Sequence, residues 1–267
     1  MDDDARRLIE LTDRLNGARN IIASIITDIE SITLHQNPSI EAEWQVTVGS
    51  WENRLLEAQI AMRRAKRKCA LAQSYINHDA VVDDEEIESQ LDTEFAEWQD
   101  KLASAVSGYI QALNIRANTI KIDQTKSQAL KEVFRILAKR LHPDINAKLD
   151  EEARMMFFLA QSAYKQADLE MLESLEVSTR GKEPKLKVPQ TLDEAEIELA
   201  LALAQVNVLE KRKKDLMADR PYCLLALLRD EEWLESHIGK MKKEIEACEK
   251  AEADYRERYE QRMEQHG

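Results

Sequence analysis

Apolar residues recur every three or four positions over most of this chain, which predicts long amphipathic helices. In the first run the steps alternate between three and four, the spacing of a coiled-coil seam. Its members are Leu8, Leu11, Leu15, Ala18, Ile22, Ile25, Ile29 and Ile32. Pro38 then interrupts the pattern and Ser39 offers an N-cap, so we expect the helix to break at residues 35–39.

Two further seams follow, one over residues 44–76 and one over residues 87–113. The polar stretch "NHDAVVDDEE" separates them. Short breaks between long helices imply that each helix packs antiparallel to the one before. We therefore expect residues 1–118 to form an N-terminal helical bundle or folded-back coiled coil.

Residues 177–190 contain Gly181, Pro184 and Pro189 without an apolar period, which predicts a linker. Thr191 and Glu194 then have the spacing of a capping box, and residues 191–267 are predicted to form a C-terminal helical hairpin. Its tip carries "LLALL" at 224–228. This tip either folds back against the hairpin or is an exposed anchor for a partner or client.

Composition supports an all-α fold. The chain has 267 residues with only 6 Gly and 5 Pro, so turn formers are scarce. Its net charge of −13 argues against a general nucleic-acid binder. The run "RRAKRK" at 63–68 is a local exception, and we favour a helix face that balances acidic neighbours over a nucleic-acid patch.

The cysteines Cys69, Cys223 and Cys248 are far apart, which suggests neither disulfides nor a zinc site. The N-terminus lacks the apolar core of a signal peptide, and the longest strongly apolar run, "IIASII", is too short to span a bilayer. We expect a cytoplasmic protein that needs no membrane, metal or cofactor.

The central segment, residues 119–176, has a different pattern. Residues 118–148 carry seven Lys/Arg against three Asp/Glu, whereas residues 149–176 carry two against seven. The first part has one apolar stripe, and Pro143 should end that helix at about Leu141. A second helix is predicted to run from Asp150 to about residue 176. The stripes are Leu130, Val133, Phe134, Leu137 and Leu141, then Phe157, Ala160, Tyr164, Ala167, Met171 and Leu175.

These two helices predict an antiparallel hairpin with His142, Pro143 and Asp144 at its tip. Lys131, Arg135 and Lys139 step by four along one face of the basic helix, and Arg140 lies on the other flank. One interpretation of the tip is a helix-ending turn in which Asp144 caps its own backbone. No nucleophile, metal cluster or phosphate loop accompanies it, so we do not expect an enzyme.

The stretches "LKEVFRILAKRLHPDIN" and "EEARMMFFLAQSAYKQADLEML" resemble the second and third helices of a J-domain, the module of DnaJ-type co-chaperones. The resemblance covers about 50 residues and implies docking on a DnaK-type ATPase chaperone, whose ATP hydrolysis it would trigger. It implies that Asp144 pairs with an arginine of the chaperone, and that His142 and Pro143 fix the loop. The four cations would meet an acidic surface, which favours encounter and orientation.

The chain also departs from the J-domain pattern. It has Ile145 where a lysine is common, lacks the Gly/Phe-rich and cysteine-rich regions of DnaJ, and lacks the usual first helix. We expect the end of the 87–113 helix to take over the packing of that first helix. The arrangement is similar to bacterial proteins that set a J-domain between coiled-coil segments.

Three functions remain open at this point. The first is a J-domain co-chaperone whose coiled-coil arms target the chaperone to an unidentified client or mediate homo-oligomerisation. The second is a structural scaffold whose J-like hairpin is uncoupled from the ATPase. The third is a nucleic-acid-associated protein that uses residues 63–68.

Overall fold

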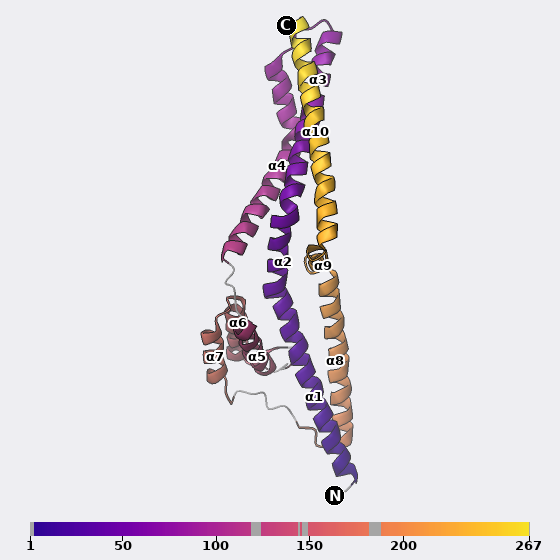
Figure 1. Ribbon diagram of the computed structural model, residues 1–267. Helices are drawn as coiled ribbons and strands as arrows, with labels where there is room; N and C mark the ends of the chain where they lie inside the picture. The colour runs from indigo at the N-terminus through magenta and orange to yellow at the C-terminus, as the bar shows by residue number, and fades with distance from the viewer. Residues whose placement is uncertain (1–2, 119–123, 144, 146–148, 182–187, 267) are drawn as a thin grey trace. The chain divides into compact units, whose positions relative to one another are not determined.

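The computed structural model describes residues 3–118, 124–143, 145, 149–181 and 188–266 (Figure 1). The fold is all-α, as predicted, and the described residues contain no strand. The chain divides into two compact units. The first comprises Met1–Pro38 and Ile120–Cys223, and the second comprises Ser39–Thr119 and Leu224–Gly267. This grouping differs from the four consecutive segments expected from the sequence.

The expected helix break at residues 35–39 is wrong. Helical backbone continues through α1 (Asp3–Ser31), η1 (Ile32–Gln36), α2 (Asn37–Trp44), η2 (Gln45–Gly49) and α3 (Ser50–Asn77). The elements η1 and η2 are single π-helical turns. Asn37 N donates to Ile32 O across the first of them. Because a π turn shifts the hydrogen-bond register by one residue, Pro38, which lacks an N–H, is accommodated without ending the helix.

In the first unit, α1 packs along α8 (Leu192–Ala218) and against α5 (Gln124–Leu141). Ion pairs join Arg7 to Glu196 near the start of both helices and Asp28 to Lys213 near their ends. These two helices therefore run in the same direction (Figure 1). The α1 seam is buried there, and its apolar partner is α8 rather than the 44–76 seam.

In the second unit, α3 packs along α10 (Glu231–His266) and against α4 (Asp84–Asn118). Lys68 pairs with Asp84 at one end of the α3–α4 contact, and Asn53 donates to the Ala105 carbonyl at the other. The order of these contacts makes α3 and α4 antiparallel, as predicted. The shared core of this unit is Ile60, Leu71, Ala72, Val82, Ile87, Leu91 and Phe95.

The C-terminal segment does not close on itself as the sequence led us to expect, because α8 packs along α1 and α10 packs along α3. The short helix α9 (Leu224–Leu228) lies between them in the chain. Leu224 and Leu228 are buried, so these two side chains of the predicted tip are not an exposed anchor.

The local signals at the starts of α6 and α8 are confirmed. The Asp150 carboxylate accepts from Ala153 N at 2.7 Å, and the Thr191 hydroxyl accepts from Glu194 N at 3.2 Å. Glu194 itself accepts from the backbone N of Gln190. Within the described residues, no helix is long and apolar enough to cross a membrane.

Candidate functional site

The predicted hairpin is formed by α5 and α6 (Glu151–Lys165), and its apolar stripe is buried as expected, with Val133 partly buried. The ring of Phe134 stacks on that of Tyr164 at 4.3 Å between centroids, with Phe157 beside it at 6.1 Å. Leu137 and Leu141 are also fully buried. This core holds the end of α5 against α6, which determines where the tip begins.

The second helix of the hairpin is shorter than expected. It ends at Lys165, and α7 (Leu169–Ser178) follows after a turn. Ala167 has φ 55°, and the Asp168 carboxylate caps α7 by accepting from Met171 N at 3.0 Å. Because this turn resets the helical phase, Met171 is 47% exposed rather than buried with the stripe.

The tip itself starts where the sequence predicted, since α5 ends at Leu141. His142 N donates to Ala138 O at 2.9 Å, and its half-buried imidazole packs edge-on against Phe157. Pro143 is exposed. Asp144, the predicted arginine partner, lies outside the described residues. His142 therefore joins the turn to α6 and leaves Pro143 facing outward.

One face of α5 carries exposed cations. Lys131 and Arg135 are exposed, one turn apart. Lys139 is also exposed, and its ammonium donates to the Asn20 side chain on α1 at 2.7 Å. The structure thus places three of the predicted docking cations on one accessible face, and one of them also contacts α1.

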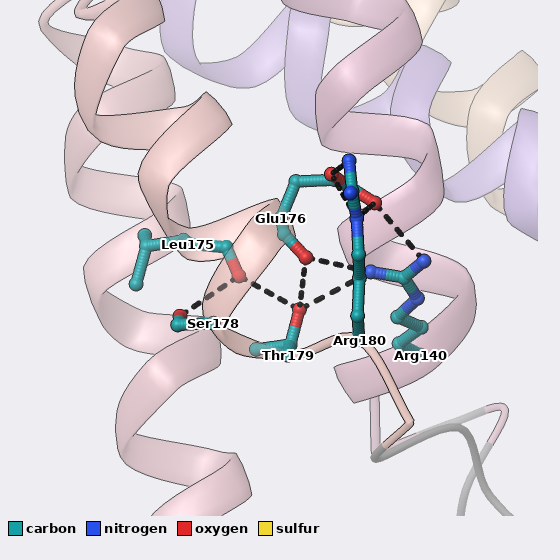
Figure 2. A network of polar contacts seen from close by, with 6 residues as sticks. All are labelled: Arg140, Leu175, Glu176, Ser178, Thr179 and Arg180. Atoms are coloured by element: carbon teal, nitrogen blue, oxygen red, sulfur yellow. Dashed lines mark hydrogen bonds and ion pairs between the residues drawn. The ribbon is translucent and has the colours of Figure 1, made fainter.

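Arg140 has a different environment (Figure 2). Its guanidinium donates to the Glu176 backbone carbonyl at 2.9 Å and to the Thr179 hydroxyl at 3.3 Å, and it pairs with the Glu176 carboxylate at 3.1 Å. The Arg140 side chain is only 12% exposed. It fastens the last turn of α5 to the end of α7, so its geometry is that of a positioning residue beside the tip.

The partners of Arg140 were not identified from the sequence. Thr179 is fully buried and donates to the Leu175 carbonyl at 2.7 Å. Arg180 bonds the Glu176 carboxylate, and this bond, with that of Arg140, lowers the pKa of Glu176. The four-residue spacing of Glu176 and Arg180 signals their ion pair. Nothing in the local pattern signals that Arg140 joins them, since residues 140 and 176 belong to different helices.

We expected the end of the 87–113 helix to pack on the hairpin, and the structure gives a different partner. The end of α4 belongs to the other unit, and α1 packs on the hairpin instead. Gln161 donates to Glu30 at 3.1 Å, and the His35 ring lies edge-on to Tyr164 at 4.7 Å. Burial raises the pKa of Glu30 and lowers that of His35.

Two cations of the basic run at 63–68 form ion pairs with carboxylates near the start of α4. Arg64 pairs with Glu88 and Asp92, and Lys68 pairs with Asp84 and Glu88. Our interpretation of this run as a face that balances acidic neighbours is confirmed for these cations. Among the described residues, no group of three or more His, Cys, Asp or Glu side chains is arranged to hold a metal ion.

Comparison of the chain with protein-family models, with curated proteins and with solved structures finds no match.

Proposed function

We propose that this chain is a J-domain-type co-chaperone that docks on a DnaK-type ATPase chaperone through α5 and the His142–Asp144 turn and stimulates its ATP hydrolysis. The observation that carries the proposal is the exposed pair Lys131 and Arg135 on the helix that leads directly into His142 and Pro143. The choice of a DnaK-type chaperone as the partner comes from the resemblance of these residues to a J-domain.

Physical chemistry supports the docking mode. An exposed cationic face raises the encounter rate with an acidic partner surface and orients it more than it adds affinity. The buried stack of Phe134, Tyr164 and Phe157 holds α5 against α6, so the helix that carries the cations has a fixed place on the hairpin. A preorganised surface loses less entropy on binding.

Arg140 has a revised role in this proposal. Because its guanidinium is bonded to α7, it holds the end of α5 in place rather than meeting the chaperone directly. The docking residues are then Lys131, Arg135 and Lys139, with His142, Pro143 and Asp144 at the turn.

The test is single-turnover ATP hydrolysis by the DnaK-type chaperone of the same organism. The intact chain should accelerate hydrolysis, and His142→Gln and Asp144→Asn should each abolish the acceleration. Arg135→Glu should weaken it, whereas Arg154→Glu, an equal charge change at an exposed site on α6, should not. Circular dichroism checks that helix content is unchanged. No acceleration by the intact chain at any concentration contradicts the proposal.

The alternative is a scaffold whose J-like hairpin is uncoupled from an ATPase. The contacts that favour it are those of Lys139 with Asn20 and of Arg140 with Glu176, because both engage predicted docking cations within the chain. Under this alternative the ATPase rate is the same with and without the protein, and the Arg135 and Arg154 variants are indistinguishable.

A further inference from the structure

The helix α8 is apolar on two faces, and only one of them is covered. The face toward α1 buries Ala195, Leu199, Ala202 and Leu209. On the other side Ile197, Leu201 and Val208 are 61%, 65% and 66% exposed. Helices that are apolar all round are normally buried on all sides. The outer face of α8 therefore has the character of an interface.

The exposed side chains have the spacing of a helix-packing seam. Ile197, Leu201, Ala204 and Val208 are separated by steps of four, three and four, the pattern that fits a second helix. Residues 199–209, "LALALAQVNVL", contain no charged side chain. A helical partner can thus contact this seam without burying a charge.

The charges at the two ends of the seam have opposite sign. Four carboxylates and no cation occur in residues 193–198, and four cations and two carboxylates occur in residues 210–215. Glu196, Glu198 and Lys213 pair with α1. At 3.6 residues per turn, Asp193 and Glu194 flank the exposed seam at its acidic end, and Lys211 and Arg212 flank it at its basic end. Within the chain, Glu194 also accepts from the backbone N of Gln190, and the charge of Arg212 also acts on Glu30 of α1.

These features make the seam complementary to itself in one direction only. When a second α8 lies antiparallel, Ile197 faces Val208 of the other copy and Leu201 faces Ala204. The same register sets the acidic flank, Asp193 and Glu194, beside the basic flank of the other copy. A parallel arrangement would place like charges together, which is unfavourable.

We propose that two copies of this chain form an antiparallel dimer through the outer face of α8, residues 193–212. The same patch is used by both copies, as in a two-fold symmetric interface. The net charge of the whole chain, −13, opposes self-association. The seam itself carries no charge, and its acidic flank attracts the basic flank of the other copy. The inference does not depend on the proposed chaperone activity, because it uses no residue of α5 or the turn.

Sedimentation equilibrium of the full chain tests the interface. The dimer fraction should rise with concentration, and Leu201→Glu should raise the dissociation constant at least about tenfold, a change of about 1.4 kcal/mol. The matched control is Ile110→Glu, at a 52% exposed apolar site on α4, which should leave the dissociation constant unchanged. A monomeric wild-type chain, or equal dimerisation of the Leu201→Glu variant, would overturn the proposal.

Disulfide trapping tests the direction of pairing, in a background with Cys223→Ser and Cys248→Ser because these two thiols are not buried. A mixture of chains carrying Ile197→Cys and Val208→Cys should cross-link, and each chain alone should not. Cross-linking of each chain alone, or none in the mixture, would overturn the antiparallel assignment. ATPase stimulation is not measured in either experiment, so this result and that of the proposed function are separable.

Discussion

The imidazole of His142 packs edge-on against the ring of Phe157, with 4.9 Å between the ring centroids and 82° between their planes. This contact ties the first residue of the turn to the neighbouring helix α6. His142, where helix α5 has just ended, is therefore held in a defined position on the hairpin.

Phe157 should therefore be a large contributor to stability. It is 4% exposed and contacts both Phe134 and His142. Phe157→Ala should lower the free energy of unfolding by about 3–5 kcal/mol, because the removed ring leaves a cavity. Urea denaturation followed by circular dichroism measures the change. The adjacent Phe158 is 65% exposed, so Phe158→Ala should change stability by less than about 0.5 kcal/mol. Equal effects of the two substitutions would contradict this assignment.

Arg140 and Arg135 should behave differently although they lie on the same helix. Arg140→Ala removes bonds to the Glu176 carbonyl and the Thr179 hydroxyl and should cost about 1–3 kcal/mol of unfolding free energy. Arg135→Ala should cost less than about 0.5 kcal/mol, since that side chain is exposed. The urea midpoints of the two variants, each compared with that of the wild-type chain, measure these losses of stability.

The bond between Arg140 and Thr179 also predicts coupling. Because the two side chains share a network, the effect of Thr179→Val should be smaller in the Arg140→Ala background than in the wild-type chain. A double-mutant cycle with strictly additive effects would show that the network contributes nothing beyond its separate parts.

Much of the hairpin could be predicted from sequence because its signals are local. The stripe from Leu130 to Leu141 specifies one buried face, Pro143 follows the end of α5, and Asp150 caps α6. Each of these features depends on residues within a few turns of one another, where helical geometry relates spacing to position.

The pairing of helices and the end of α6 could not be predicted in the same way. The α1 seam resembles the other seams of this chain, so its spacing does not distinguish α8 from α3 as a partner. Apolar residues also continue in helical spacing through Ala167, and the pattern alone did not reveal its positive φ. Long-range choices of this kind depend on contacts between distant residues, such as that of Arg140 with Glu176.

The turn between α6 and α7 gives a fourth prediction. The Asp168 carboxylate caps α7, so Asp168→Ala should lower the unfolding free energy by about 0.5–2 kcal/mol. Asp168→Asn keeps an acceptor oxygen and should be close to wild type. Thermal melts of the three proteins provide the measurement, and an Asn variant as unstable as the Ala variant would rule out the cap as the cause.

His35 should make stability depend on pH. Burial beside Tyr164 lowers its pKa from the ordinary value of about 6.5, and the charge of Lys131 acts in the same direction. The unfolded chain therefore binds a proton more readily than the folded chain. The contribution of neutral His35 is fully present above pH 6.5 and is lost as pH falls from there through the folded pKa.

The measurement is the unfolding free energy in urea between pH 7.5 and pH 5 for the wild-type chain and His35→Gln. Wild type should lose more stability on acidification than the variant, because glutamine does not titrate. Glu30, whose pKa is raised by burial, contributes with the opposite sign, but it is present in both proteins and largely cancels in the comparison. Parallel pH profiles for the two proteins would show that His35 is equally easy to protonate in the folded and unfolded chains.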